Sequence, residues 1–486
     1  MVLPIITVDS VCHVEPEGIV LNSVAQTDAQ EGHLTGMGSL HTLVLSTLHH
    51  QAHRIMTIDR RISKYIVWLA LLLAGTIPIS TGWAQTLPRA LPEDVGMSSE
   101  RLERLTEAMQ AYVDQDRLAG IVIQVIRHGK TAYLESFGEM DRELGVPMAE
   151  NVIFRIASQS KAIVSIGSLI LQEEGKLLIS DPVGKFIPEF MSTTVAVPDE
   201  DGGYTVVDVE RPITIRDLLT HTSGVSYGYG PASDRWEEAD IQNYYFSHRD
   251  EPILETVKRM AGLPFDLQPG TEFLYGYSTD ILGAVLEVAS DMALDEFLED
   301  RIFEPLQMTD THFYLPEEKR GRLSTVYAGV EGGGIEPAED PGLATGQGAF
   351  VDGPRKSFSG GAGLLSTAND YARFLQMLLN GGELEGVRVL SPTTVRLILS
   401  DHLTDVESPW NQAAGFGLGF YVVKDVGAWA RPSSVGEFGW GGAYHSTYWA
   451  DPSENLVVVY FTQLVSTQGI DDHRKLRALI YQAIVE

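Results

Sequence analysis

The chain has 486 residues, of which 44% are hydrophobic and 21% charged, a composition typical of a globular protein with an ordinary buried core. Its formal net charge is −31, from 35 Lys plus Arg against 66 Asp plus Glu. Because so acidic a surface repels phosphate backbones and anionic lipids, the charge argues against a nucleic acid or an anionic membrane as a partner.

Residues 56–84 have the layout of a secretory signal peptide. Basic residues come first, an apolar run at 65–75 follows, and small residues stand just before Gln85. This order predicts cleavage near Ala84 and Gln85, and therefore a periplasmic or secreted protein. The apolar run is too short to span a bilayer, so we expect no stable membrane anchor. The alternative is an ordinary buried helix at 66–74.

Residues 1–55 stand before this expected signal peptide. We interpret them as a non-native or mis-assigned N-terminal extension, because a signal peptide ordinarily begins a protein. The single cysteine, Cys12, lies in this extension. The remaining domain, residues 85–486, then has no thiol, which excludes disulfides, cysteine–metal sites and a cysteine nucleophile.

The first elements of this domain are a helix and a hairpin. Apolar residues follow Ser98 and Ser99 at helical spacing, which predicts an amphipathic helix, and residues 120–138 form two β-rich runs joined by a turn. The apolar positions of the helix are Leu102, Leu105, Met109 and Val113. A polar stretch and a second helix, which begins around Ser158, come next.

The middle of the chain is irregular and then helical. An acidic turn at 198–203 separates two Val-rich runs, after which helical segments without strands are expected up to about residue 390. Strand patterns return at 415–423, 437–452 and 456–464, before a closing helix from Asp471. We therefore expect an α/β protein of the α+β type. One antiparallel sheet is built from both termini and flanked by helices, with an inserted, mainly helical lobe.

Ser158 and Lys161 stand one turn apart where the second helix begins. Residues three apart on a helix share one face, with Cβ atoms about 5 to 6 Å apart. An amine in that place can take the hydroxyl proton as Ser158 attacks an acyl carbon, and the helix N-terminus favours the negative charge that forms. The Ser-x-x-Lys pattern alone is weak, because a chain of this length shows about one by chance.

Ser226 is the competing nucleophile. The sequence GVSYG at 224–228 matches the Gly-x-Ser-x-Gly elbow of α/β-hydrolases, which requires a strand before the serine and a helix after it. Here the preceding segment has a helical pattern and breakers follow. The context therefore favours Ser158.

Seven blocks of sequence, in order, resemble the serine β-lactamase-related superfamily, and most closely the family VIII carboxylesterases. These share their fold with class C β-lactamases and DD-peptidases, and the resemblance runs from about 92 to 484. The blocks are GIVIQVIRHGKTAYLESFG, FRIASQSKAIVSIGSLILQEEGKL, RPITIRDLLTHTSG, YGYSTDILGAVLE, IFEPLQMTDTHFY, GAGLLSTANDYARFLQMLLNGG and FGWGGAY.

This resemblance implies roles for particular residues. Ser158 corresponds to the acylated nucleophile and Lys161 to its partner in proton transfer. The second motif, Tyr-x-Asn in β-lactamases, falls on residues 275–277, which makes Tyr275 the catalytic phenol and places Tyr277 at a substrate-binding position. Tyr277 as the catalytic phenol, or either ring as core packing, remains an alternative.

The third motif, Lys-Thr-Gly in β-lactamases, corresponds to Trp440, Gly441 and Gly442, the esterase form, which the resemblance implies is a substrate-binding edge. Two glycines in a strand are unfavourable unless a ligand or another backbone must approach closely, and we expect the substrate acyl group there. The resemblance also implies that the backbone N–H groups of Ser158 and Ala443 form the oxyanion hole.

Three histidine-related expectations complete the site. His445 and Ser446 replace the small residues usual at their positions, and we expect His445 to face solvent. His221 belongs to the family pattern, where we expect it to stabilise a loop. We expect neither a metal, since no histidines have the spacing of a metal site, nor a cofactor.

An aromatic segment between residues 227 and 246 is predicted to lie beside the cleft. It can form the wall of an acyl or alcohol pocket or simply pack a lid onto its own lobe. Its rings are Tyr227, Tyr229, Trp236, Tyr244, Tyr245 and Phe246.

The sequence leaves three functions open. The first is a secreted carboxylesterase that cleaves a small-molecule ester, with a short acyl chain, through an acyl-enzyme on Ser158. The second is a β-lactamase or DD-peptidase that uses the same residues on an amide. The third is a homologue that binds β-lactams or cell wall without turnover. The sequence carries no signal for an oligomeric state.

Overall fold

Strands from the two ends of the chain meet in one antiparallel sheet. In the computed structural model, which describes residues 86–242, 245–339, 348–467 and 469–486, eight strands pair in the order β13-β14-β15-β16-β17-β1-β2-β3. They are β1 (Gly120–Arg127), β2 (Lys130–Asp141), β3 (Val146–Pro147), β13 (Ala414–Phe416), β14 (Tyr421–Val423), β15 (Phe438–Gly441), β16 (Thr447–Asp451) and β17 (Leu456–Phe461). The sheet from both termini is therefore confirmed. The expected extension, 1–55, and signal peptide, 56–84, lie outside the described residues.

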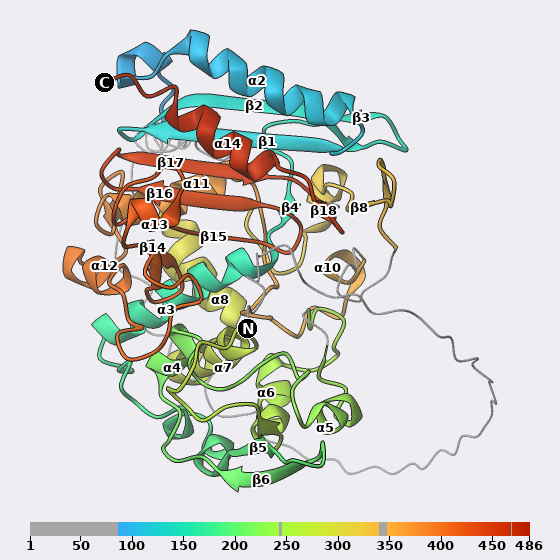
Figure 1. Cartoon of the computed structure of the whole chain (residues 1–486), viewed down its shortest axis with the longest axis vertical. Coiled ribbons are helices and arrows are strands. Elements are labelled where there is room, and N and C mark those ends of the chain that lie inside the picture. Colours follow the sequence, from blue (N-terminus) through green and yellow to red (C-terminus); the bar gives the residue numbers. More distant parts are fainter. Residues whose placement is uncertain (1–85, 243–244, 340–347, 468) are drawn as a thin grey trace, which may run out of the picture. The chain divides into compact units, whose positions relative to one another are not determined.

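Strand β1 lies inside the sheet, between β2 and β17, and is buried on both faces. Ile121, Ile123 and Val125 belong to the core under α2 (Ser99–Asp114) and α14 (Asp472–Tyr481). The alternating residues Val122 and Ile126 belong to the main core, on the side of α11 (Ala368–Leu379). Figure 1 shows α2 and α14 together beside the sheet. Because side chains of a strand alternate between faces, helices on both sides require the nearly continuous apolar sequence of β1.

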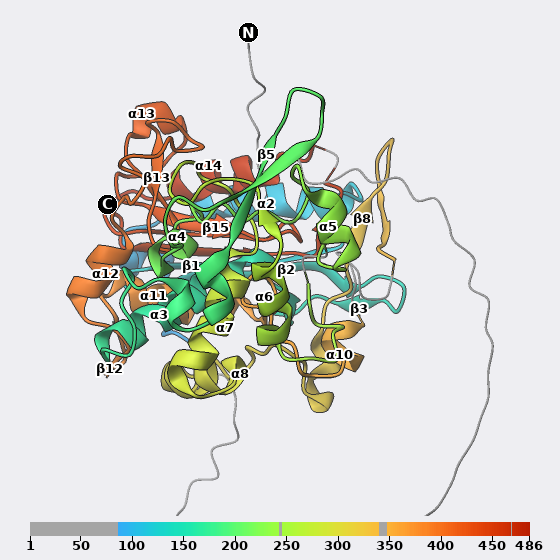
Figure 2. The same cartoon turned by 90° about the horizontal axis from the view of Figure 1, so that it is seen from below.

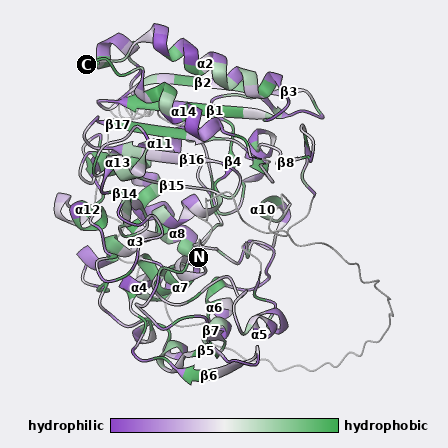
Figure 3. Cartoon of the chain, viewed as in Figure 1, coloured by the Kyte–Doolittle hydropathy of each residue, from purple (hydrophilic) through white to green (hydrophobic). Residues whose placement is uncertain are grey.

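The predicted amphipathic helix is α2. Ser98 is its N-cap, and the Ser98 Oγ accepts a hydrogen bond from the backbone N–H of Arg101 at 3.3 Å. Leu102, Leu105 and Met109 are buried as the spacing predicts, whereas Val113 is only partly buried. Figure 3 shows hydrophilic and hydrophobic residues alternating along α2, as expected for a helix with one buried face.

A helical lobe is inserted between the two groups of strands. Helix α7 is its centre, because α3, α4, α6 and α8 all pack against α7. The lobe contains α3 (Ser160–Glu173), α4 (Ile215–Leu219), α5 (Ser233–Glu238), α6 (Ile253–Ala261), α7 (Ser278–Ser290), α8 (Leu294–Leu298) and α9 (Glu304–Leu306). Later short helices are α10 (Ala349–Asp352), α12 (Pro392–Ile398) and α13 (Val426–Trp429).

The expectation of strandless, helical segments from the acidic turn to about residue 390 is wrong, because short strands lie there, and further short strands lie before and after that stretch. The two Val-rich runs beside the acidic turn pair with each other. Short strands form four small sheets, and the hairpin of β5 and β6 extends from the lobe in Figure 2. The strands are β4 (Phe154–Arg155), β5 (Thr194–Pro198), β6 (Tyr204–Asp208), β7 (Pro264–Phe265), β8 (Tyr327–Gly329), β9 (Ile335–Pro337), β10 (Leu365–Ser366), β11 (Glu383–Leu384), β12 (Val387–Arg388) and β18 (Leu464–Val465). Most have only two or three residues, too few to show a period of two in the sequence.

Short 3₁₀-helical turns and one π-helical turn connect these elements in the described part of the chain. The 3₁₀ turns are η1 (Pro92–Val95), η2 (Ala157–Gln159), η3 (Val183–Lys185), η4 (Pro188–Ser192) and η6 (Glu317–Arg322), and η5 (Glu299–Phe303) is a π-helical turn. Across the described part of the chain, no helix is both long enough and apolar enough to cross a bilayer.

Candidate active site

Ser158 lies in the η2 turn that leads directly into α3. The preceding residue, Ala157, has φ of +44°, a left-handed conformation that a residue with a Cβ rarely adopts. The turn is held on both sides, since the Tyr371 hydroxyl donates to the Gln159 carbonyl at 2.9 Å and the Leu364 N–H donates to Ser160 Oγ at 3.0 Å. Ser158 itself is partly exposed, so its hydroxyl is accessible at the start of the helix.

Lys161 is buried one turn further on and faces the lobe. Its Nζ donates to the Gly361 carbonyl at 2.7 Å and to the Tyr227 hydroxyl at 3.2 Å. The same nitrogen lies 4.6 Å from the centroid of the Tyr275 ring. The structure therefore brings the predicted lysine and the predicted phenol together.

Asp280 supports this arrangement from beneath. It accepts hydrogen bonds from the Ser359 hydroxyl at 2.6 Å and from the Gly361 N–H at 3.0 Å, so it fixes the residue whose carbonyl holds Lys161. Burial raises the pKa of Asp280, and the positive charge of Lys161 opposes that rise.

Tyr275 joins Lys161 to the end of β15. The Trp440 indole N–H donates to the Tyr275 hydroxyl at 3.1 Å, and the two rings lie 5.5 Å apart. On another side of Tyr275, the ring of His221 lies 4.5 Å away. Burial, together with the charge of Lys161, lowers the pKa of His221 well below its ordinary value, so this imidazole is neutral. The His221 carbonyl accepts from the Leu274 N–H at 2.7 Å, which agrees with a loop-stabilising position.

The structure contradicts a substrate-binding position for Tyr277. Its side chain has no exposed surface. The ring stacks on Trp236 at 5.9 Å and packs against Phe246 at 5.4 Å and Tyr227 at 5.0 Å. The physical reason is its place immediately before α7, where the chain turns the ring into the main apolar core.

Tyr227 is a site residue that sequence reasoning did not identify individually. Its hydroxyl accepts the hydrogen bond from Lys161, and its ring meets that of Tyr275 edge to face at 6.0 Å. Burial raises the pKa of Tyr227 well above its ordinary value, and the neighbouring Tyr275 and Asp280 add to the rise. The signal in the sequence was the position of Tyr227 shortly after His221, which belongs to the family pattern.

The rest of the aromatic segment is mostly packing. Trp236, Tyr245 and Phe246 are buried in the hydrophobic clusters, whereas Tyr229 is exposed. Tyr244 lies outside the described residues. Packing therefore describes most of the described rings of this segment, whereas Tyr227 contacts Lys161 and Tyr275 of the candidate site.

The end of β15 lies against the turn that carries Ser158. A Cβ added to Gly442 would lie 2.6 Å from the carbonyl oxygen of Ile156, so only glycine fits there. The close neighbour is thus backbone rather than the substrate acyl group that the sequence suggested. Trp440 and Gly441 are partly exposed and Ala443 is exposed. The contact brings the turn that carries Ala443 against the turn that carries Ser158.

Both backbone N–H groups expected in the oxyanion hole are free to bind a ligand. Within the described ranges, no carbonyl or side chain accepts a hydrogen bond from the N–H of Ser158 or Ala443. Free donors on two adjoining turns suit an acyl oxygen that becomes negatively charged.

Ser226 does not lie in a nucleophile elbow. It is in the loop between α4 and α5, and its Oγ accepts a hydrogen bond from the Gly228 N–H at 3.0 Å. Neither the strand before it nor the helix directly after it is present. The elbow pattern is therefore coincidental in its structural context.

The expectation that His445 faces solvent is wrong. Its side chain is buried, and its Nε2 lies 2.8 Å from Asp472 Oδ1. His473 stacks on His445 at 4.0 Å. The sequence places Asp472 and His473 far from residue 445, so their spacing could not reveal this group of two imidazoles and one carboxylate, which are the side-chain types that bind metals.

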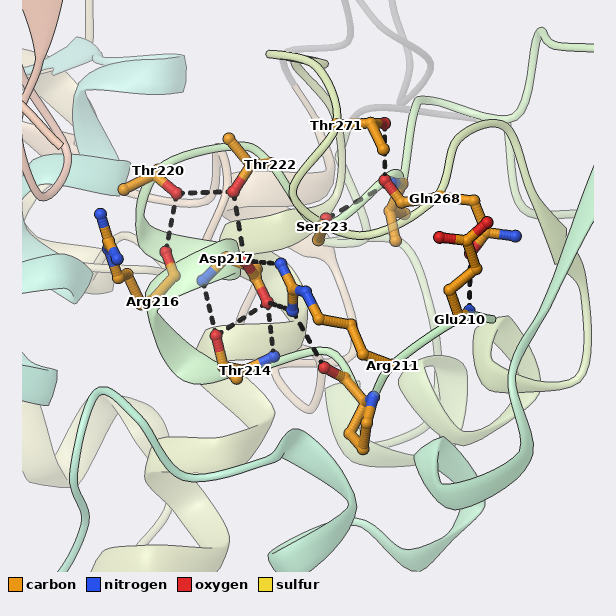
Figure 4. Close-up of polar contacts among 12 residues, drawn as sticks. Glu210, Arg211, Thr214, Arg216, Asp217, Thr220, Thr222, Ser223, Gln268 and Thr271 are labelled. Atoms are coloured by element: carbon orange, nitrogen blue, oxygen red, sulfur yellow. Dashed lines mark hydrogen bonds and ion pairs between the residues drawn. The ribbon is translucent and has the colours of Figure 1, made fainter. Parts of the chain in front are cut away.

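The loop that carries His221 and Tyr227 is supported by a buried carboxylate. Figure 4 shows Asp217 at the centre of hydrogen bonds from Arg211, Thr214 and Thr222. Arg211 binds it through two nitrogens, at 2.6 and 2.9 Å, and Asp217 also closes the N-terminal capping box of α4 with Thr214. These contacts fix the start of the segment that ends in the site.

The chain is similar to known proteins over most of its length. Residues 105–482 match the sequence profile of the family described as Beta-lactamase. Protein Rv1367c of Mycobacterium tuberculosis is 35% identical over 381 residues (75% of this chain and 90% of the relative), and Esterase EstB of Burkholderia gladioli is 31% identical over 389 residues (77% and 93%). The solved structure of EstCE1, described as a hydrolase with promiscuous acyltransferase activity, is 27% identical with a TM-score of 0.67, over 78% of this chain and 98% of that one.

Proposed function

Because the chain belongs to the beta-lactamase family, within the serine β-lactamase-related superfamily, we propose that it cleaves carboxylic esters through an acyl-enzyme on Ser158. The observation that carries the proposal is the environment of Lys161, whose buried Nζ touches one phenol and lies over the ring of another, one turn from Ser158. An esterase relative, EstB, supports the choice of reaction.

The proposed reaction has two halves. The Ser158 oxygen attacks the ester carbonyl carbon while its proton passes to Lys161 and Tyr275, and the tetrahedral oxyanion accepts hydrogen bonds from the N–H groups of Ser158 and Ala443. The carbon–oxygen bond to the alcohol then breaks, and the alkoxide takes the proton. In the second half, a water gives a proton to the same residues as its oxygen attacks the acyl carbon. The bond from that carbon to the Ser158 oxygen then breaks, Ser158 takes the proton, and the acid leaves.

The preference for esters over β-lactams rests on two positions. The β-lactamase pattern has asparagine and lysine where this chain has Tyr277 and Trp440. Tyr277 is buried, and the only polar atom of the Trp440 side chain is hydrogen-bonded to Tyr275. Neither offers an amide or a cation to the substrate, and a site without those partners does not favour a substrate that needs them.

The aromatic residues around Trp440 bear on the size of the proposed substrate. Trp440 packs against Phe416 at 5.4 Å and Trp410 at 5.7 Å, and this aromatic wall next to Tyr275 suits a small-molecule ester with a short acyl chain.

The signal-peptide layout of residues 56–84 supports a periplasmic or secreted location.

Parallel kinetics with p-nitrophenyl butyrate and a chromogenic cephalosporin test the function. We expect kcat/KM for the ester to exceed that for the cephalosporin by orders of magnitude, with slow lactam hydrolysis or covalent inhibition, because both react with Ser158. Efficient cephalosporin turnover with negligible ester hydrolysis would instead establish the amide reaction. A single burst without turnover on either substrate would identify a binding protein.

A further inference from the structure

The turn between β15 and β16, residues 442–446, carries one of the two proposed oxyanion donors. The turn closes on itself, since the Gly442 N–H donates to the Ser446 carbonyl at 2.8 Å and the His445 N–H donates to the Gly442 carbonyl at 3.1 Å. Ala443 is its exposed tip. Any movement of this turn therefore moves the Ala443 N–H relative to Ser158.

His445 holds an unusual conformation within the turn. Its φ is +63°, in the left-handed region that a histidine rarely adopts. Such a conformation persists only where the surroundings enforce it. The contacts that surround His445 include that of its own side chain, whose Nε2 lies 2.8 Å from Asp472 Oδ1.

Asp472, the first residue of α14, anchors His445 to the rest of the protein. It is fully buried, and its second oxygen accepts a hydrogen bond from the Tyr460 hydroxyl of β17 at 2.5 Å. Burial alone would raise the pKa of Asp472, but the hydrogen bond and charge of His445, and the charge of His473, outweigh burial and hold this pKa below its ordinary value. The carboxylate is therefore ionised when the clamp is formed.

His473 holds the main chain of the same residue. Its Nε2 lies 3.0 Å from the His445 carbonyl oxygen, and the two imidazole planes stack at 4.0 Å with an angle of 12°. The first turn of α14 thus contacts both the side chain and the backbone of His445. The base of the turn is also held, since Ser446 Oγ donates to the Thr462 carbonyl at 2.9 Å and the Tyr444 carbonyl accepts from the Leu464 N–H at 3.1 Å. The two contacts of His445 add the attachment to α14.

A metal site is the alternative interpretation of the side chains of His445, Asp472 and His473, and their hydrogen bonds argue against it. Nε2 of each imidazole and both oxygens of Asp472 already have hydrogen-bond partners within the protein. In addition, the lone pair of an imidazole lies in its ring plane, so two stacked rings direct their nitrogens side by side rather than toward one ion.

We propose that His445, clamped by Asp472 and His473, is a positioning residue that fixes the 442–446 turn and with it the Ala443 N–H of the oxyanion hole. The inference rests on the proposed function, since it concerns the same acyl transfer. Removing an oxyanion donor lowers kcat by about 10²- to 10³-fold in a serine hydrolase. Displacing one, without removing it, is expected to cost about 10- to 100-fold in kcat.

Two variants and a neighbouring control test the clamp. His445→Asn keeps a residue that tolerates positive φ but is too short to reach Asp472, and Asp472→Asn keeps the shape while removing the charge. Each should lower kcat for p-nitrophenyl butyrate by about 10- to 100-fold with KM changed less than about twofold. Asp471→Asn is the control, because Asp471 bonds Tyr112 rather than the turn, and its kcat should stay near that of the unaltered protein. Circular dichroism melts establish that each variant is folded at the assay temperature.

Several results would overturn the clamp. One is an unchanged kcat in a folded His445→Asn variant, and another is a raised KM with an unchanged kcat, which would indicate substrate contact. If the unaltered protein hydrolyses no ester, the proposed function fails, and the rate at which a fluorophosphonate labels Ser158 becomes the readout. Slower labelling in both variants than in Asp471→Asn supports the clamp, and equal labelling rates, or no labelling of the unaltered protein, contradict it.

Discussion

At the scale of single residues, Ser158 and Ser226 compete for the role of nucleophile, and the structure separates their surroundings. Ser158→Ala should abolish nearly all ester turnover while the protein stays folded, because the neighbouring hydroxyl of Ser160 is buried and bound to the Leu364 N–H. Ser226→Ala should retain most of the activity, since Ser226 lies in a loop and bonds a backbone N–H. Steady-state kinetics on the two purified variants decide the matter. An active Ser158→Ala beside a folded but inactive Ser226→Ala would reverse the assignment.

Lys161 and Tyr275 are expected to act as one proton-transfer unit. A lysine and a tyrosine have reference pKa values of about 10.4 and 10, so adjacent groups can share a proton. Lys161→Ala and Tyr275→Phe should each lower kcat by orders of magnitude, and the double variant by little more, because residues that act together are not additive. The measurement is kcat for all three variants.

The variant Tyr227→Phe tests whether Tyr227, rather than Tyr275, transfers the proton. Tyr227 accepts a hydrogen bond from Lys161, so a folded Tyr275→Phe variant with nearly full activity would move the proton-transfer role to Tyr227. Tyr277, the alternative suggested by sequence, is a poor second choice because its ring is buried in the core.

Local spacing explains which site residues could be predicted. Ser158 and Lys161 are three apart, and Tyr275 lies in a recognisable block, so each can be named from a short stretch of sequence. Tyr227 meets Lys161 across the lobe, and His445 meets Asp472 from another element, so both contacts depend on the folded chain. The predicted substrate-binding position of Tyr277 is wrong for a related reason, since the place of a residue in a motif does not reveal which way its ring points.

At the scale of elements, the loop after α4 depends on Asp217. Asp217→Ala should lower the free energy of unfolding by about 2 kcal/mol, because it removes a helix cap and takes an acceptor from the partly buried Thr214 and the buried Thr222. Urea denaturation measures this change. Asp234→Ala is the control, since Asp234 is exposed at the start of α5, and it should change stability by less than about 0.5 kcal/mol. Equal effects of the two substitutions would show that the buried network does not stabilise the loop.

Element prediction succeeded where the pattern was long. The helix α2, the first hairpin and the late strands β16 and β17 each extend over enough residues for their patterns to show, and the sequence located all of them. The two-residue strands β4 and β10 pair with each other across the fold and have no such signal. Their pairing is nevertheless important, because β4 leads into the turn that carries Ser158.

At the scale of the whole molecule, everything before Gln85 is expected to be dispensable for activity. A chain that starts at Gln85 should fold and hydrolyse esters with the same kcat and melting temperature as the full chain, because residues 56–84 are assigned to export. Mass spectrometry of the protein secreted by its native host should find an N-terminus near Gln85. A mature protein that retains residues 1–55 would contradict both the signal peptide and the interpretation of the extension.

The position of β1 between β2 and β17 has a consequence for how the protein is made. Val122 pairs with Phe461, so the interior of the sheet stays incomplete until nearly the last residues have been synthesised. Contacts between residues so distant in sequence slow folding, because a long loop must close before they form. The proposed export would benefit from this delay, since a chain that cannot close its sheet on the ribosome remains unfolded enough to pass through a secretion channel. The same dependence makes loss of the C-terminal strands damaging to the whole sheet, including the turn that carries Ala443.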